Sequence, residues 1–395
     1  MHSKDIKPEL PEQEVIIINK ELSITEALFP VIILVGLLAY NIFIFGDSAL
    51  SGSNQFILII GAAVAAIVGF RNKVSYQQMM EEVGHNVKST SGAILILLMV
   101  GALSGTWLLS GVIPSMIYYG LQILTPSIFL AASLVICSIV SLATGSSWST
   151  SATVGIALIG IGQTMGINPG MTAGAVISGA YFGDKISPLS DTTNLASAMA
   201  GAELFDHIKY MLMTTVPSIL VALVVFLIIG FNISATGSPD ISDKLNAIDA
   251  AFNISPWLFL VPAVVIFLII KKTQPLVALL AGALLGGIVA IIAQPEIVVK
   301  IAEGTTLDFN TAYKGVMKSL TTKTSIETTN PELNDLFSAK GMEGMLGTIW
   351  LILCAMVFGG VMDAIGALAR ISQALLNMFH TVFGLFASTV LSCLA

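Results

Sequence analysis

The chain has 395 residues, of which 55% are hydrophobic and only 10% are Asp, Glu, Lys or Arg, and its formal net charge is −7. Because a soluble globular protein carries about 25% charged residues, this composition argues against a water-soluble domain and indicates an all-α polytopic membrane protein. The sequence has no basic cluster, which argues against a nucleic-acid partner. Its three cysteines lie in apolar runs without metal-ligand spacing and are interpreted as small core residues.

Long apolar runs predict the membrane spans, because a span needs about 20 mostly apolar residues. The predicted spans are 28–46, 56–70, 92–113, 210–231, 256–270, 275–293, 345–368 and 380–395. Residues 1–27 are acidic and mixed, and they predict a cytoplasmic N-terminal tail rather than a signal peptide. Residues 74–91 predict a polar, amphipathic connector, and Lys and Arg in the tail and near this connector place both on the cytoplasmic side.

Two polar, glycine-punctuated patches interrupt the apolar sequence, at 144–151 and at 183–194. Residues 127–167 carry the first patch at their centre and predict either two full spans or a re-entrant hairpin; the serine-rich, uncharged tip favours the hairpin. Residues 170–201 predict one crossing that is broken at the second patch, where Pro188 removes a helix donor. Broken helices at membrane depth survive where they are buried or line a cavity.

Hydroxyl, amide and carboxylate oxygens in these patches are hard ligands of the kind a small cation needs, so we expect a Na⁺ and proton site here. Asp184 and Asp191 lead the candidates, because a carboxylate inside a membrane span is functional by default. Asp184, Asp191 and Asn194 are the expected Na⁺ ligands. The remaining candidate oxygens belong to Thr192, Thr193, Ser146, Ser147 and Thr150.

Structural alternatives stay open for each of these residues. Lys185 could pair with one of the two aspartates, and Thr193 or Asn194 could cap the helix that follows. The hydroxyls at 146, 147 and 150 could serve tight packing of small residues. The sequence does not decide which aspartate binds Na⁺ and which carries H⁺. Elsewhere, we expect Asp363 to pair with Arg370, seven residues on along one helical face.

A weak internal repeat appears when the chain is shifted by 255 positions, which aligns Gly92–Val140 with Gly347–Ala395. Gly105 then meets Gly360, and Gly111 meets Gly366. Such halves are typical of inverted-repeat transporters. We predict a first repeat at 28–231, an external loop at 232–255 and a second repeat at 256–395 that contains a polar loop at 294–340. In the connectors before each copy, Tyr76 and Met80 are similar to Tyr313 and Met317. Since the last residue corresponds to position 140, ahead of the first patch, we expect the second repeat to be truncated.

The run Thr144-Gly145-Ser146-Ser147-Trp148 and the run from Gly183 to Ala196, GDKISPLSDTTNLA, resemble the hallmark segments of the NhaC Na⁺/H⁺ antiporter family. The resemblance extends from about residue 24 to the end. It implies a multi-pass protein of the cell membrane that exchanges cytoplasmic Na⁺ for external H⁺. Some relatives instead couple Na⁺ and H⁺ to malate and lactate exchange, and this is the alternative function.

The absence of arginine between residues 92 and 209 favours the cation exchanger, because an organic anion would want Arg or helix N-termini for its carboxylates. An enzyme is not expected, because the sequence contains neither a His-Glu-x-x-His nor a Gly-x-Ser-x-Gly pattern. The expected partners are Na⁺, H⁺ and the lipid bilayer, with no cofactor beyond the transported ions. A homo-oligomer is compatible with the sequence.

Overall fold

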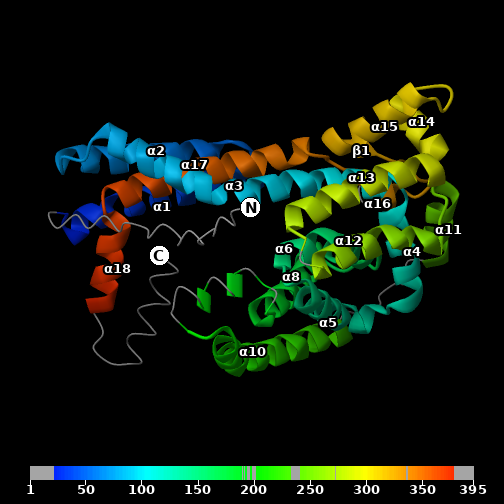
Figure 1. The fold of residues 1–395 in the computed structure, drawn as a ribbon, viewed down its shortest axis with the longest axis horizontal. Helices are drawn as coiled ribbons and strands as arrows, with labels where there is room; N and C mark the ends of the chain where they lie inside the picture. The colour runs from blue at the N-terminus through cyan, green and yellow to red at the C-terminus, as the bar shows by residue number, and fades with distance from the viewer. Residues whose placement is uncertain are drawn as a thin grey trace, which may run out of the picture. The chain divides into compact units, whose positions relative to one another are not determined.

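The computed structural model describes residues 22–188, 190, 192–193, 196–197, 202–232, 241–271, 273–334 and 337–377. Nearly all of these residues are helical (Figure 1). Contacts divide the chain into two compact units. Unit 1 comprises Met1–Ser91 with Gly347–Ala395, and unit 2 comprises Gly92–Leu346.

Unit 1 is built from long apolar helices of both ends of the chain. Its elements are α1 (Ile24–Phe45), η1 (Gly46–Ser51), α2 (Ser53–Arg71), the first part of α3 (Tyr76–Leu109), α17 (Leu346–Ala364) and α18 (Ala367–Asn377). The helix α1 begins at a capping box, in which Ser23 and Glu26 each bond the other's backbone N–H. Small residues let the helices approach, since a Cβ at Gly69 would meet Met79 and Ile365 at 2.5 and 2.6 Å.

Unit 2 contains the remaining helices and a short pair of strands. Its first half holds α4 (Val112–Ile123), α5 (Pro126–Thr144), α6 (Ser147–Thr150), the π-helix η2 (Ser151–Gly155), α7 (Ile156–Thr164), α8 (Pro169–Ile186) and α10 (Leu204–Asn232). Its second half holds α11 (Ile241–Ala251), η3 (Pro256–Phe259), α12 (Leu260–Ile270), α13 (Pro275–Ala293), α14 (Pro295–Ala302), α15 (Phe309–Thr321), α16 (Pro331–Asn334) and η4 (Glu343–Met345). The strands β1 (Thr324–Ser325) and β2 (Ser338–Ala339) pair antiparallel.

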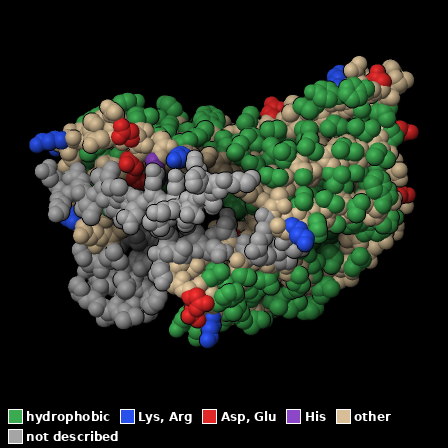
Figure 2. Space-filling model, viewed as in Figure 1, with side chains coloured by type: hydrophobic (Ala, Val, Ile, Leu, Met, Phe, Trp, Pro, Cys, Tyr) green, Lys and Arg blue, Asp and Glu red, His purple; other side chains and the backbone are tan. Residues whose placement is uncertain are grey.

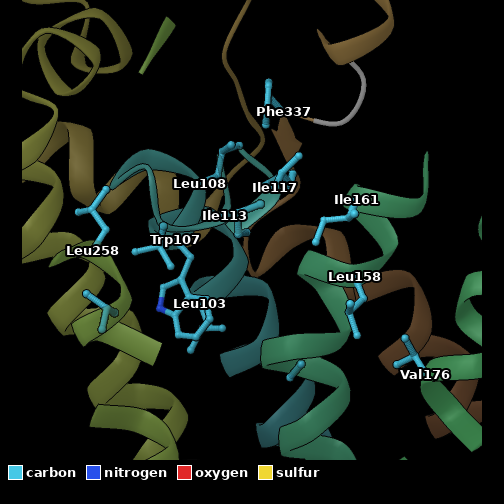
Figure 3. Packing of buried hydrophobic residues seen from close by; sticks show 14 of the residues in the cluster. Leu103, Trp107, Leu108, Ile113, Ile117, Leu158, Ile161, Val176, Leu258 and Phe337 are labelled. Carbon is cyan, nitrogen blue, oxygen red and sulfur yellow. The ribbon is translucent and has the colours of Figure 1, made fainter. Parts of the chain in front are cut away.

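The centre of unit 2 is a buried cluster around Trp107 on α3 (Figure 3). Leu103, Leu108, Ile113 and Ile117 from α3 and α4 belong to the same cluster. The Trp107 indole N–H donates to the Gly282 carbonyl on α13 at 3.2 Å. This bond satisfies the one polar atom of a fully buried side chain, as burial requires.

Six helices among the described residues are long and apolar enough to cross a membrane: α1, α2, α3, α10, α13 and the segment Glu343–Ala364. A seventh span is formed if Ser242–Ala251 and Pro256–Ile269, bent by 82°, are taken together. The all-α polytopic membrane class is therefore confirmed. The predicted span at 380–395 lies outside the described residues.

Two predicted connecting segments are more ordered than the sequence analysis assumed. Residues 76–91 are not a separate connector, because α3 runs without a break through this segment and the following span to Leu109. An amphipathic stretch without Pro continues an adjoining helix when its apolar side chains find a partner, and Met79 and Val83 are buried in unit 1. The polar stretch 294–340 likewise contains α14 and α15.

The two copies of the predicted repeat break their helices at the same aligned position. Gly111 lies between α3 and α4, and Gly366 lies between α17 and α18. Both glycines have left-handed backbone, with φ of +79° and +72°. The shift of 255 positions therefore aligns the helix ends as well as the glycines, while the inverted relation of the two copies stays a prediction.

The segment 127–167 folds back on itself at the first polar patch. The helix α5 ends at Gly145, whose φ of +68° turns the chain, and α6, η2 and α7 lead back. Pro126–Leu142 and Ser151–Thr164 are apolar but shorter than a full span. Two helices of this length agree with the predicted re-entrant hairpin. The depth to which the hairpin enters a membrane stays a prediction.

Candidate functional site

The site is positioned by close packing of α5 against α8. Gly179 and Gly183 lie four residues apart on one face of α8, and a Cβ at either position would run into the α5 backbone. A Cβ at Gly179 would meet the Leu134 carbonyl oxygen, and one at Gly183 would meet the Leu142 nitrogen. Helix backbones in membrane proteins approach this closely where small residues repeat every fourth position.

Hydroxyl groups fix the register of the two helices. The Ser141 Oγ donates to the Ala180 carbonyl, and the Ser187 Oγ donates to the Leu142 carbonyl at 2.9 Å. All of these atoms lie near the C-terminal ends of α5 and α8. The two predicted polar patches follow these ends, and the packing therefore brings them together.

Asp184 lies in the last turn of α8 and accepts a hydrogen bond at each carboxylate oxygen. The Ser147 Oγ, at the start of α6, donates to Oδ2 at 2.8 Å, and the Ser190 Oγ donates to Oδ1 at 2.7 Å. The Asp184 side chain is buried, with 8% of the residue exposed. The first patch supplies one donor and the second patch supplies the other, as the expected joint site requires.

Ser190 is the residue that the sequence analysis missed. Its Oγ contacts the Thr192 Oγ1 at 2.8 Å and accepts from the backbone N–H of Thr193 at 3.3 Å, in addition to its bond to Asp184. A hydroxyl that accepts from the N–H three residues on has the geometry of an N-cap. Ser190 therefore has the geometry of a cap, while the capping considered for Thr193 or Asn194 stays open because Asn194 and most of residues 195–201 lie outside the described residues. The sequence carried a signal for this role, because serine is a preferred N-cap residue and Ser190 follows the helix-breaking Pro188 by two positions.

Thr193 ties the broken segment back to α8 instead. Its Oγ1 lies 3.0 Å from the Asp184 carbonyl oxygen and 3.1 Å from the Lys185 carbonyl oxygen. Carbonyls in the last turn of a helix have no partner within the helix and carry partial negative charge. Thr193 is thus a structural neighbour of the carboxylate.

Ser146 and Thr150 belong to the same patch as Ser147. The Thr150 Oγ1 donates to the Ser146 carbonyl at 2.9 Å, and Thr150 is fully buried. The π-helix η2 follows at once, an element that often marks functional sites and that the sequence did not predict. The role of Ser146 and Thr150 as ion ligands stays a prediction.

Asp191 and Asn194 lie outside the described residues, so their roles as Na⁺ ligands stay predictions. Lys185 is exposed, and in the described part of the chain the Asp184 carboxylate bonds to hydroxyls rather than to the lysine. The alternative in which Lys185 neutralises Asp184 is therefore wrong for that aspartate. For Asp191 the question stays open.

The expected pairing of Asp363 with Arg370 is not seen between these two described residues. Instead, the Asn86 Nδ2 donates to Asp363 Oδ2 at 3.2 Å within unit 1. The Arg370 Nε is buried without a hydrogen-bond partner. Gly366 ends the helix between them, so the helical periodicity that predicted their pairing does not continue across the break.

The arrangement around Asp184 is suited to a small hard cation. One carboxylate is surrounded by hydroxyl oxygens that retain lone pairs, at the C-terminal end of a helix where positive charge is favoured. Within the described ranges, no three His, Cys, Asp or Glu side chains gather as a transition-metal site would require. The chemistry of the site is that of oxygen ligation combined with one titratable group.

Comparison with known proteins places this region within a described family. A model of the Na⁺/H⁺ antiporter family matches residues 179–395, which include Asp184. The malate-2H⁺/Na⁺-lactate antiporter of Bacillus subtilis (strain 168) is 37% identical over 350 residues, covering 86% of this chain and 70% of that protein. The Na⁺/H⁺ antiporter NhaC of Alkalihalophilus pseudofirmus is 35% identical over 335 residues, covering 85% of this chain and 70% of that protein.

A third relative is an uncharacterized Na⁺/H⁺ antiporter of Haemophilus influenzae, which is 34% identical over 369 residues. That match covers 93% of this chain and 76% of the relative. No solved structure gives a significant match. The similarity to these antiporters extends over most of the chain and is not confined to the two polar patches.

Proposed function

The chain belongs to the Na⁺/H⁺ antiporter family, and we propose that it exchanges Na⁺ for H⁺ with Asp184 as the carboxylate for which the two ions compete. The resemblance to NhaC antiporters that the sequence indicated is confirmed by relatives about one-third identical. The bonds from Ser147 and Ser190 to the two oxygens of a buried Asp184 carry the assignment of the site. Because the relatives are antiporters, we assign transport rather than catalysis.

Exchange follows from mutual exclusion at one carboxylate. In its ionised form, Asp184 offers negative charge to Na⁺, while the hydroxyl oxygens of Ser147, Ser190 and Thr192 supply neutral ligands. Protonation of the carboxylate removes that charge and one ligand, so a bound proton and a bound Na⁺ exclude each other. Opening of the site to the two sides of the membrane in turn then converts competition into antiport. Asp191 and Asn194 would complete the ligand set.

The membrane concerned is the cell membrane, with the N-terminus on the cytoplasmic side. This orientation is supported by Lys and Arg in the tail and around residues 71–88, according to the positive-inside rule. The partners are then Na⁺ and H⁺ from the two aqueous phases and the surrounding lipid.

The second candidate function is Na⁺-coupled exchange of malate and lactate, which the name of the 37% identical relative favours. Against it, no arginine occurs between residues 92 and 209 to bind a carboxylate. Na⁺/H⁺ exchange needs only NaCl in the assay medium, whereas the carboxylate exchange also needs lactate or malate. One experiment therefore distinguishes the two functions.

The experiment uses everted membrane vesicles from a strain that lacks its own antiporters. Dissipation of a respiratory pH gradient by NaCl alone supports Na⁺/H⁺ exchange. A response only when lactate or malate is present on the appropriate sides assigns the chain to the carboxylate antiporters instead. In either case Asp184→Asn should insert into the membrane and abolish the response, and normal exchange in this variant would contradict the site.

Ser190→Ala provides a graded test of the same site. It removes one hydrogen bond to an ionised group, which is worth about 1.5–3 kcal/mol, so half-saturating Na⁺ should rise roughly ten- to a hundredfold. Ser178→Ala is the matched control on α8, because the Ser178 Oγ donates to the Gly174 carbonyl at 2.7 Å. Equal Na⁺ dependence in the two variants would remove Ser190 from the site.

A further inference from the structure

Outside the ion site, unit 2 carries a two-helix hairpin formed by α14 and α15, here called the α14–α15 hairpin. Its helices pack closely, since a Cβ at Gly315 would meet the Val298 carbonyl oxygen at 2.7 Å. The Lys318 Nζ, in the last turn of α15, donates at 2.7 Å to Oε1 of Glu303, which follows α14, and the Asp308 side chain caps α15 by accepting from the Thr311 N–H at 2.7 Å. The hairpin is therefore an ordered element.

The surface of α15 is divided into three sectors, which follow from a rotation of about 100° per residue. One sector packs against the protein and contains Ala312, Gly315 and Ser319. The second sector is apolar and exposed, with Phe309 at 84%, Tyr313 at 61% and Met317 at 38% exposure. The third sector is polar and contains Asn310, Lys314 and Lys318. A helix that met only protein and water would need no second sector.

Contacts place α15 beside the ends of two membrane spans. The Val316 side chain would meet a Cβ at Gly287 of α13 at 2.7 Å, and the Ser319 carbonyl lies against Gly105 of α3. Gly287 lies six residues before the end of α13, and Gly105 lies four before the end of α3. At a rise of about 1.5 Å per residue, α15 lies within roughly 6–9 Å of both helix ends. Amphipathic helices at a bilayer surface insert to a similar depth.

The span α13, against which α15 packs at Gly287, carries a face that is suited to lipid. Every third or fourth residue of α13 is a large exposed aliphatic side chain: Val277, Leu280, Leu284, Ile288 and Ile292. This stripe lies on a candidate span and borders Gly287, the point at which α15 packs. In the view of Figure 2, hydrophobic side chains cover much of unit 2 and charged side chains are few.

We propose that the α14–α15 hairpin is an interfacial anchor, in which Phe309, Tyr313 and Met317 of α15 insert into the bilayer at the level of the lipid headgroups. The proposed occupant of this face is the same bilayer lipid that the exposed aliphatic stripe on α13 is suited to meet, and no second protein is required. Tyrosine suits this level because its ring is apolar and its hydroxyl reaches water. Lys314, in the neighbouring polar sector, faces the headgroup phosphates and the aqueous phase.

The test is spin labelling of the full chain, with its native cysteines replaced by alanine, in vesicles of phosphatidylcholine and phosphatidylglycerol. Nitroxides at Tyr313→Cys and Phe309→Cys should collide more with oxygen, which concentrates in lipid, than with a water-soluble nickel chelate. A nitroxide at Lys314→Cys, which lies in the polar sector about 100° around the helix from Tyr313, should show the reverse preference. The three native side chains are exposed, so the labels displace no packing.

Two results would overturn the proposal. Nickel collisions at Phe309→Cys and Tyr313→Cys as frequent as at Lys314→Cys would show that the face meets water. Protection of these two labels from both reagents would show that protein covers the face, as a second copy or another polypeptide would. Neither result bears on the ion site, because the measurement involves no transport.

Discussion

Substitution of Gly183 by alanine should damage both the packing of α5 on α8 and the ion site. The added Cβ would meet the Leu142 backbone nitrogen, the Ser141 Cβ at 2.6 Å and the Ser138 carbonyl oxygen at 2.7 Å. Two of these three atoms belong to backbone, so no side chain can rotate away to make room. The helices must separate, and Asp184, the next residue on α8, moves with its helix.

The magnitude follows from two opposing terms. Alanine is a better helix former than glycine by about 1 kcal/mol, which favours the variant. Overpacking of a well-packed contact costs about 1–3 kcal/mol, and a backbone clash belongs at the upper end of that range. We therefore expect a net loss of about 1–2 kcal/mol in stability. A shift of about 1 Å also exceeds the tolerance of the bond from Ser147 to Asp184, so Na⁺ affinity should fall too.

The control is Gly174→Ala on the same helix. A Cβ there would meet only the Phe226 ring at 3.7 Å, which is ordinary contact, so only the gain in helix propensity remains. Thermal unfolding midpoints in detergent and Na⁺ dependence of exchange in vesicles should be measured for both variants. Gly183→Ala should unfold earlier than the parent chain, and Gly174→Ala should unfold no earlier. Equal midpoints and equal Na⁺ dependence in the two variants would refute the packing argument.

Two further predictions concern charged groups away from the ion site. The buried Lys244 Nζ donates to the Thr164 carbonyl at 2.8 Å, so Lys244→Met should cost about 1–3 kcal/mol in thermal unfolding, whereas exposed Lys300→Met should leave the midpoint unchanged. The hydrogen bond and charge of Lys318 hold the pKa of Glu303 below its ordinary value of 4.5. This pair therefore stabilises the α14–α15 hairpin above pH 4.5, and the stabilisation is lost as the pH falls through the lowered pKa. Hydrogen exchange of the hairpin amides, corrected for the intrinsic rate, should therefore accelerate at acid pH in the parent chain and less in Lys318→Met, where only Lys314 still faces Glu303, with a smaller difference at high salt.

The sequence predicted the membrane class, and it indicated the two polar patches that meet at Asp184, because both features depend on local composition. Apolar runs of span length and oxygen-rich interruptions are visible in any short window, and Asp184 stood out as a carboxylate within such a run. The shift of 255 positions also paired Gly111 with Gly366, and the structure then showed a helix break at both, where the sequence had predicted continuous spans. Its further implication, that the two copies are inverted, stays a prediction.

Predictions from the sequence pattern were wrong where a helix continued through a polar stretch or ended within an apolar one. The polarity of residues 76–91 suggested a connector separate from the following span. These residues belong to the same helix as the span, because burial of Met79 and Val83 stabilises the helix there. Asp363 and Arg370 share a face only on an unbroken helix, and Gly366 intervenes. The π-helix at Ser151–Gly155 left no signal, since it depends on packing against neighbouring helices.

By itself, the sequence determined the two polar patches and the oxygen-bearing residue types that they offer to the candidate site. Only the tertiary structure decided that Ser147 and Ser190 hold the two oxygens of one carboxylate and that Lys185 does not. The reason is physical: Ser147 and Asp184 are separated by 37 positions, and they meet because glycines on α8 let its backbone contact α5. That contact depends on atoms distant in sequence, which no local pattern records.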